Sequence, residues 1–401
     1  MMNINFKNKK VLVRVDFNVP LDADYNITDD TRIQAALPTI KKILADGGAA
    51  ILMSHLGRPG KKTKPDGSID IERFTLNHVT QHLANLLKVN VHFCPETVGD
   101  KANLMAKKLT MGEVLILENT RFNKGEKKGN EDFAQQLATL ADVYINDAFG
   151  TAHRAHASTT TVAKFFSKEN KAFGYLMENE IKNGHKVLNQ PERPLTAIIG
   201  GAKVSDKILL LEKLLEFADN IIVGGGMAYT FMKAQGGKVG NSLVEDDRLE
   251  LALKLIAKAK NQGVKLLLPK DSLVADNFSN EANIATKYSK RIPKNWMGLD
   301  IGPKAITDFS KVIQKSKTIL WNGPMGVFEM PNFAKGTKSI ATSVAEATKN
   351  GAFSLVGGGD SVAAVTQMGL NDDVSFVSTG GGAMLEFLEG KTLPAVAAMQ
   401  E

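Results

Sequence analysis

The chain has 401 residues, 43% of them hydrophobic and 23% charged, which is ordinary globular composition and enough length for two domains. No apolar run reaches the ~18 residues of a membrane-spanning helix, and the polar start of the chain lacks a secretory hydrophobic region. The net charge of +7 favours anionic partners. Because the basic residues do not gather in one tail with aromatic residues, we expect small phosphorylated ligands rather than nucleic acid. The single cysteine, Cys94, excludes an internal disulfide and fits a reducing cytoplasm; its strand-like surroundings predict a core position.

The first half of the chain alternates short apolar segments with amphipathic ones. The apolar segments predict strands at residues 10–15, 49–53, 114–117 and 143–145, and another that begins at Val91. Apolar residues on one helical face predict helices at 32–45 and 133–140, and a third marked by Leu76, Val79, Leu83 and Leu86. This alternation predicts βαβ units and a parallel sheet with helices on both faces.

The same alternation restarts in the second half. Strands are predicted at residues 197–199, 221–223, 265–268, 318–320, 353–356 and 374–377, and helices at 207–217, 247–260 and 335–349. The segment 165–194 fits neither set, and it contains a polar, helix-like piece at 177–188. We therefore expect an N-terminal domain at 1–172, a connecting helix and hinge at 173–194, and a C-terminal domain at 195–389. The predicted fold class is α/β, with two doubly wound, Rossmann-like parallel-sheet domains joined by a helix.

Five basic segments lie at predicted strand ends or in loops of the first half, at 14–20, Arg32, 54–59, 118–122 and 150–156. Within them, His55, Arg58, Arg121 and Arg154 each follow a predicted strand. Ligands of open parallel sheets bind outside the carboxyl ends of the strands, so these side chains should meet at one rim. Arginine presents a planar, permanently charged fork that matches phosphate and carboxylate. For each arginine alone a surface ion pair is the commoner explanation, but several at the same topological position favour an anion site.

Glycine-rich turns follow four predicted strands of the second half, beginning at Gly200, Gly224, Gly357 and Ser378. Glycine lets backbone approach a ligand closely, and a helix N-terminus after such a turn exposes amides that favour phosphate. Asp360 is either a Mg²⁺ ligand beside those phosphates or an ordinary N-cap. Lys203 and Lys207 are one helical turn apart, so both ammonium groups could face the same phosphate chain.

Several common nucleotide and metal motifs do not occur in the sequence. The P-loop pattern, the G-x-G-x-x-G dinucleotide pattern and the protein-kinase H-R-D and D-F-G motifs are all absent. Neither do histidine, cysteine and aspartate residues show the spacing of a zinc site. A nucleotide site would therefore have another design.

Eight stretches together resemble the phosphoglycerate kinase family. They are RVDFNVP (14–20), SHLGRP (54–59), FGTAHRAHAS (149–158), GGAKVSDK (200–207), GGGMAYTF (224–231), WNGPMGVFE (321–329), GGGDS (357–361) and STGGGA (378–383). The resemblance covers essentially the whole chain and is highly specific as a set, although each glycine triplet alone is a weak signal.

The resemblance implies reversible phosphoryl transfer from 1,3-bisphosphoglycerate to MgADP, giving 3-phosphoglycerate and MgATP after hinge closure. It implies that the N-terminal domain binds the glycerate and the C-terminal domain the nucleotide, with residues from about 390 to 401 packed back on the N-terminal domain. The implied substrate residues are Asp16, Phe17, Asn18, Arg32, His55, Leu56, Gly57, Arg58, Arg121 and Arg154. The implied nucleotide residues are Ala202, Lys203, Lys207, Gly226, Gly298, Asn322, Glu329, Gly358, Gly359, Asp360 and Ser361, with Asp360 also binding Mg²⁺. The implied catalytic groups are Arg32, Lys203, Lys207, Gly359 and Gly382.

The sequence departs from the family pattern at Lys270 and Thr120, where apolar residues are usual, and at Met384, a variation that we cannot interpret. The family expectation is a monomer without nucleic-acid or membrane partners. Alternatives are another acyl-phosphate kinase with a different carboxylate, a non-catalytic phosphate-ligand binding protein, and a nucleic-acid binder. The first leaves the basic residues of the first half unexplained, and the second leaves the glycine-rich turns unexplained.

Overall fold

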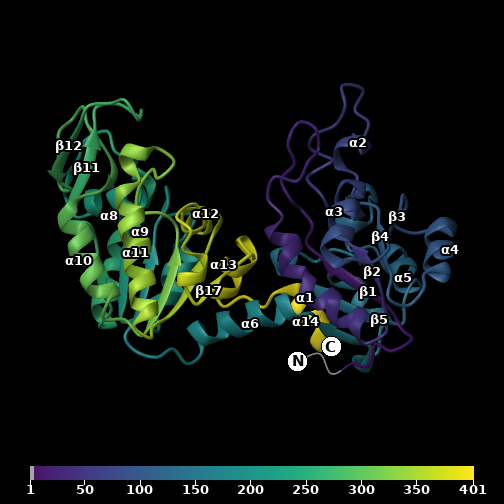
Figure 1. Cartoon of the computed structure of the whole chain (residues 1–401). Helices are drawn as coiled ribbons and strands as arrows, with labels where there is room; N and C mark the ends of the chain where they lie inside the picture. Colours follow the sequence, from purple (N-terminus) through teal and green to yellow (C-terminus); the bar gives the residue numbers. More distant parts are fainter. Residues whose placement is uncertain (1–3) are drawn as a thin grey trace. The chain divides into compact units, whose positions relative to one another are not determined.

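The computed structural model describes residues 4–401, which form two compact units (Figure 1). The first unit extends to Ile181 and also includes Thr392–Glu401, and the second unit is Lys182–Lys391. The boundary between the units falls within helix α6 (Tyr175–Leu188). In the part of the chain from residue 4 onward, no helix is long and apolar enough to cross a membrane.

The first unit is built on a six-stranded parallel sheet with the strand order β3-β4-β2-β1-β5-β6. Its strands are β1 (Lys10–Val15), β2 (Ala49–Met53), β3 (Val91–Cys94), β4 (Val114–Leu117), β5 (Val143–Asp147) and β6 (Lys171–Phe173). Its helices are α1 (Thr31–Ala45), α2 (Ile71–Phe74), α3 (Asn77–Leu87), α4 (Asp100–Lys108), α5 (Glu131–Ala138) and α14 (Pro394–Gln400).

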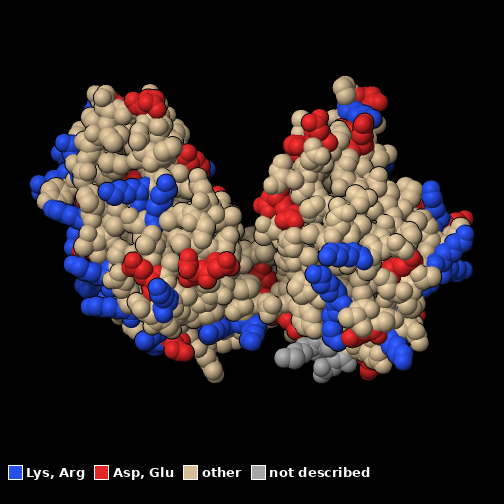
Figure 2. Space-filling model, in the orientation of Figure 1, with Lys and Arg blue, Asp and Glu red and all other residues tan. Residues whose placement is uncertain are grey.

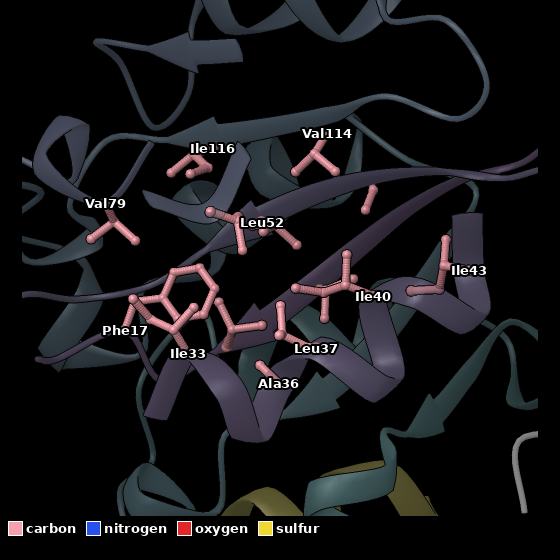
Figure 3. Close-up of a cluster of buried hydrophobic side chains, with 14 of the residues drawn as sticks. Phe17, Ile33, Ala36, Leu37, Ile40, Ile43, Leu52, Val79, Val114 and Ile116 are labelled. Atoms are coloured by element: carbon pink, nitrogen blue, oxygen red, sulfur yellow. The ribbon is translucent and has the colours of Figure 1, made fainter. Parts of the chain in front are cut away.

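The two faces of this sheet carry separate hydrophobic cores because successive strand residues point to opposite sides. Val11 of β1 belongs to the core that α1 covers, where Ile33 and Ile40 of α1 lie against the strands (Figure 3). Leu12 belongs to the core on the opposite face. Cys94 is also buried in that second core, which confirms its predicted position.

The C-terminal helix α14 packs against the first unit. The amide of Ala395 donates to the carbonyl of Ala152 at 3.1 Å, and Lys171 Nζ donates to the carbonyl of Ala398 at 3.2 Å. Met399 joins the hydrophobic core. The last ten residues of the chain therefore belong to the first unit although they follow the second in sequence.

The second unit contains another six-stranded parallel sheet, with the order β10-β8-β7-β15-β16-β17. Its strands are β7 (Leu195–Ile199), β8 (Asn220–Val223), β10 (Lys265–Leu267), β15 (Thr318–Asn322), β16 (Phe353–Gly357) and β17 (Phe376–Val377). Its helices are α7 (Ile208–Leu214), α8 (Met227–Ala234), α9 (Leu249–Asn261), α10 (Pro303–Ile313), α11 (Lys335–Lys349), α12 (Gly359–Gln367) and α13 (Gly382–Leu388). Two parallel α/β sheets confirm the predicted fold class.

Some elements differ from the sequence prediction. The segment 165–194, which fitted neither set of predicted elements, contains β6, which extends the first sheet beside β5. The second unit also has a small antiparallel sheet of β11 (Asp271–Ala275), β12 (Ile284–Tyr288) and β14 (Met297–Ile301), and a short pair of β9 (Lys238–Val239) with β13 (Arg291–Ile292). β12 is largely exposed, and β9 and β13 have only two residues each, so these strands have no apolar pattern to recognise. β11 and β14 are mostly buried, but they are short and each contains an aspartate.

Candidate active site

The basic residues of the first unit lie in one electrostatic neighbourhood, although they follow four different strands. Burial and the charges of Arg14 and Arg154 lower the pKa of Arg121 to about 10. Burial and the charges of Arg14, Arg121, Arg32 and Arg154, in that order, lower the pKa of His55 well below its ordinary value. We call these five residues the basic cluster. The parallel sheet brings them together because β1, β2, β4 and β5 all end at the same edge.

Arg14 opens the first basic segment of the chain, but the sequence analysis assigned it no role in binding. Its side chain is fully buried at the end of β1, where Nε donates to Ser158 Oγ at 2.8 Å. Ser158 Oγ in turn donates to the buried carboxylate of Glu126 at 2.6 Å. The hydrogen bonds offset the cost of burying the guanidinium charge. The only signal in the sequence was an arginine inside an otherwise apolar strand.

His55 is held as a neutral hydrogen-bond donor. Its Nδ1 lies 3.2 Å from Arg14 Nη2 and 3.9 Å from Asp16 Oδ1. Since a guanidinium can only donate, Nδ1 is the acceptor in the Arg14 contact and the imidazole hydrogen is on Nε2. Because its pKa is lowered, the imidazole of His55 is neutral near pH 7.

The remaining polar contacts fix the loops around the basic cluster. Arg32, near the start of α1, forms an ion pair with Asp16 after β1. The backbone of Gly57 is held from two sides, with its amide donating to Asn18 Oδ1 at 2.7 Å and its carbonyl accepting from Arg121 Nη1 at 2.6 Å. These contacts connect the loops after β1, β2 and β4.

The other expected substrate residues differ in exposure. Arg58 is exposed. Burial lowers the pKa of Lys127, and the charges of Arg121, Lys61, Arg154 and Arg58, in that order, lower it further. Phe17 and Leu56 are buried in the hydrophobic core. Their side chains therefore face protein, which leaves only their backbone for a ligand.

The second unit has a cavity of about 440 Å³ beside its glycine-rich turns. Five of the expected nucleotide residues line it, namely Ala202, Gly226, Gly298, Glu329 and Asp360. The sequence analysis missed its apolar wall, which includes Tyr229, Leu243, Phe278, Met297, Leu299 and Val327. Apolar walls with a few polar groups are typical of cofactor and small-molecule sites.

The turns that border this cavity are packed directly on one another. A Cβ added at Gly200 would lie 1.9 Å from the carbonyl oxygen of Pro324. The amide of Gly201 donates to the same oxygen at 3.2 Å, and the amide of Gly225 donates to the carbonyl of Met325 at 3.0 Å. The glycines after β7 and β8 therefore serve close backbone packing as well as access for a ligand.

The helical spacing inferred for Lys203 and Lys207 is wrong. Residues 203–207 form bends and turns, and α7 begins only at Ile208. Lys203 is exposed, whereas Lys207 is half-buried and its Nζ donates to Asn322 Oδ1. Burial lowers the pKa of Lys207, while Asp206 and Asp360 oppose this shift. The spacing argument failed because residues in a turn before a helix do not follow the periodicity of the helix. Of the two lysines, only Lys207 is held beside β15, by its hydrogen bond to Asn322.

Two helix N-termini provide backbone amides close to these turns. Gly358 has a φ of +89° and precedes α12, which begins at Gly359, and Gly382 begins α13. The hydroxyl of Ser361 is fully buried and accepts from the amide of Gly323 at 2.5 Å. The Ser361 side chain therefore connects two turns. The features that favour phosphate here are the dipole of α12 and the backbone amides at its start.

Asp300, in the wall of the same cavity, is a buried carboxylate that joins two elements. Its Oδ2 accepts from the amide of Gly336 at 2.6 Å, and its Oδ1 from the amide of Ile301 at 2.8 Å. Burial raises its pKa to about 7, against the two hydrogen bonds, which lower it. The ordinary pKa of an aspartate is 3.8. Between pH 3.8 and about 7, Asp300 is therefore protonated in the folded state and ionised in the unfolded state.

We predict that local stability around Asp300 falls as pH rises from about 4 to about 7 and then levels off, by an amount on the order of 1–4 kcal/mol. Hydrogen exchange of the amides of Gly336 and Ile301, measured from pH 5 to pH 8 and corrected for the intrinsic rate, would report this opening. Asp300→Asn should remove most of the pH dependence. A wild-type opening free energy that is flat or rises over this range would contradict the prediction.

Comparison with known proteins agrees with this architecture. A family model described as phosphoglycerate kinase matches residues 1–391. The chain is 53% identical to phosphoglycerate kinase of Porphyromonas gingivalis, covering 99% of this chain and 98% of that protein, and 52% identical to that of Nostoc, covering 99% and 97%. Among solved structures it resembles phosphoglycerate kinase from Coxiella burnetii, with a TM-score of 0.88 at 41% identity and coverage of 100% and 98%.

Two parallel α/β units, one with a basic cluster and one with a glycine-lined cavity, define a phosphotransferase of the small-molecule kinase class. Within this class, the comparisons show a phosphotransferase with a carboxyl group as acceptor. The chain belongs to the phosphoglycerate kinase family.

Proposed function

We propose that the protein interconverts 1,3-bisphosphoglycerate with ADP and 3-phosphoglycerate with ATP, as expected for a glycolytic phosphoglycerate kinase. The observation that supports this substrate best is the basic cluster. Four arginines with few acids among them suit a ligand that carries both a carboxylate and a phosphate. We also propose that the protein acts in the cytoplasm and that it is a monomer.

On the substrate side, we assign the distal phosphate of the glycerate to the arginines at the sheet edge and to neutral His55. Arg58, Arg121 and Arg154 would bind the phosphate, and His55 would donate from Nε2. Asp16 would orient Arg32 through their ion pair, so that Arg32 points to the carboxyl oxygen and the transferred phosphoryl group. Binding energy from the distal phosphate would thereby position the reacting carboxylate.

On the nucleotide side, we assign the base and sugar to the cavity wall around Gly226, Gly298 and Glu329. Lys207, oriented by Asn322, would bind the phosphates together with the amides at Gly359 and Gly382. Lys203, which is exposed, would add charge from the turn. These donors would stabilise the charge that spreads over the phosphoryl oxygens in the transition state.

The residues present fit a Mg²⁺ ion that is carried in by the nucleotide. Within residues 4–401, no group of three or more histidine, cysteine or acidic side chains could hold a metal by itself. Mg²⁺ commonly uses one or two carboxylates together with phosphate oxygens, and Asp360 offers a carboxylate at the cavity wall. When bound, the ion would neutralise charge on the phosphate oxygens.

Little covalent chemistry is required of the protein, because in-line transfer needs positioning and charge stabilisation. The carboxylate oxygen of the glycerate and the terminal phosphorus of ATP must meet in water-free surroundings. We therefore include in the proposal a closure about the hinge that brings the two ligands together.

The first test is turnover of 3-phosphoglycerate with MgATP, coupled through glyceraldehyde-3-phosphate dehydrogenase to NADH oxidation. We predict that Asp360→Ala lowers kcat/KM by about 10²-fold or more, since a charge-stabilising group is lost. Asp372→Ala, which removes an exposed acid after α12, should leave turnover unchanged. Full activity of Asp360→Ala at ordinary Mg²⁺ concentrations would contradict the metal assignment.

The same assay separates the alternatives. Turnover with another carboxylate but not with 3-phosphoglycerate would favour a different acyl-phosphate kinase, and ligand binding without turnover would favour a binding protein. Nucleic-acid binding has little support, because each unit carries acidic as well as basic side chains on the face shown in Figure 2.

A further inference from the structure

The second unit has another cavity, of about 870 Å³, which is unrelated to the phosphoryl-transfer assignments. It shares no lining residue with the cavity beside the glycine-rich turns. We call it the β10 groove. Residues of α8, α9 and β10 line it, together with residues from the segments 268–270 and 288–291.

The floor of the β10 groove consists of apolar side chains that are left partly uncovered because β10 is the edge strand of its sheet. No further strand continues the sheet beyond β10 among residues 4–401, so the strand and the segment after it leave Leu266 and Leu268 only partly covered. Helices α8 and α9 supply Met232 and Ile256 to the same floor. A compact apolar floor of this kind suits an alkyl or aryl body.

The rim of the β10 groove is basic and contains no acidic residue. Lys260, Lys270, Lys290 and Arg291 line it, and their segments are tied together where the amide of Ser289 donates to the carbonyl of Lys270 at 3.0 Å. Lys270 is paired with Asp308 at 2.6 Å. For Lys260, Lys290 and Arg291, no carboxylate within the described chain lies at ion-pair distance. Three cations beside an apolar floor therefore lack a protein counter-ion.

We propose that the β10 groove binds a small amphiphilic anion, with its apolar body on the floor and its phosphate or carboxylate head at Lys260, Lys290 and Arg291. Both halves of this ligand chemistry are needed. An apolar molecule alone would make no charge-assisted contact with the exposed cations, and an inorganic anion alone would leave the apolar floor in contact with water. Tyr288, at the same rim, adds a partly exposed aromatic face.

The test is calorimetric titration of the full-length protein with decyl phosphate below its critical micelle concentration. We expect saturable binding of one equivalent, and decanol should bind at least about ten-fold more weakly because it has no charge for the rim. The double variant Lys260→Glu/Lys290→Glu should weaken decyl phosphate binding by about ten-fold or more. The matched control Lys315→Glu/Lys349→Glu changes two exposed lysines of the same unit outside the groove and should bind like the wild type.

Two further measurements keep the result independent of the proposed function. Turnover of 3-phosphoglycerate with MgATP, measured without decyl phosphate, should be unchanged in both double variants, which also shows that they fold. Saturating MgADP should not displace decyl phosphate. Displacement by MgADP, equal weakening in the control variant, or binding only to vesicles of anionic lipid would each overturn the proposal.

Discussion

Replacing Arg32 by alanine is expected to lower kcat by about 10²–10³-fold, with a smaller change in the KM for 3-phosphoglycerate. Arg32 stands near the start of α1 and is oriented by its ion pair with Asp16, with a side chain that remains 37% exposed and hence available to a ligand. In the proposed mechanism it meets charge that develops on the transferred group, so its contribution is largest in the transition state.

Arg58→Ala is the informative partner of this substitution. Arg58 is exposed in the loop after β2 and is assigned to the distal phosphate, which does not change during transfer. Its loss should mainly raise KM, by about ten-fold or more, since a charge-assisted contact present throughout is removed. Arg73→Ala, on exposed α2 in the same unit, controls for the general loss of positive charge.

Steady-state kinetics with 3-phosphoglycerate varied at saturating MgATP would separate the two roles. Arg32→Lys should recover only part of kcat, because an ammonium keeps the charge but loses the planar fork. Equal changes in kcat and KM in both alanine variants would show that the assignment of the two arginines is wrong.

The basic cluster was largely predictable because it depends on topology. Arg121, Arg154 and His55 follow apolar strands, and parallel strands end at one edge whatever the detailed packing. Arg14 was not predictable in the same way. Its partner Ser158 is 144 residues away, and only the folded structure shows that a strand arginine is satisfied there rather than paired at the surface.

The cavity beside the glycine-rich turns shows what local sequence patterns do not contain. Its glycine turns were recognised, but Leu243 and Phe278 reach it from segments without any motif. Long-range packing decides which apolar side chains remain partly exposed at a cavity, and these two are 48% and 58% exposed. The i,i+4 argument for Lys203 failed for the opposite reason, since it applied helical periodicity to a turn that precedes the helix.

Replacing Gly200 by alanine is expected to destabilise the second unit by about 3 kcal/mol or more. The added Cβ would lie 1.9 Å from the carbonyl oxygen of Pro324 and 2.7 Å from that of Gly323. Both neighbours are backbone, so neither can move as the end of a flexible side chain would. The carbonyl of Pro324 accepts from the amide of Gly201 in the turn after β7, and the carbonyl of Gly323 accepts from Trp321 Nε1 at 2.8 Å. The turns after β7 and β15 must separate.

This separation should also weaken MgADP binding, by about ten-fold or more, because the turns carry Ala202 and Pro324 of the cavity wall and adjoin the contact of Lys207 with Asn322. Urea unfolding followed by the fluorescence of buried Trp321 would report stability, and calorimetric titration with MgADP would report binding. The two effects share one cause, so they should appear together.

Gly359→Ala is the matched control, since no atom lies within 4 Å of the Cβ that it would add. Its stability should change by less than about 1 kcal/mol. If the amides at the start of α12 do bind phosphate, Gly359→Ala should nevertheless weaken MgADP binding, because the new methyl group occupies the approach to them. Gly200→Ala would then lose stability and affinity together, and Gly359→Ala affinity alone. A Gly200→Ala protein that unfolds at the wild-type urea concentration would show that the turns after β7 and β15 are not packed as closely as the structure has them.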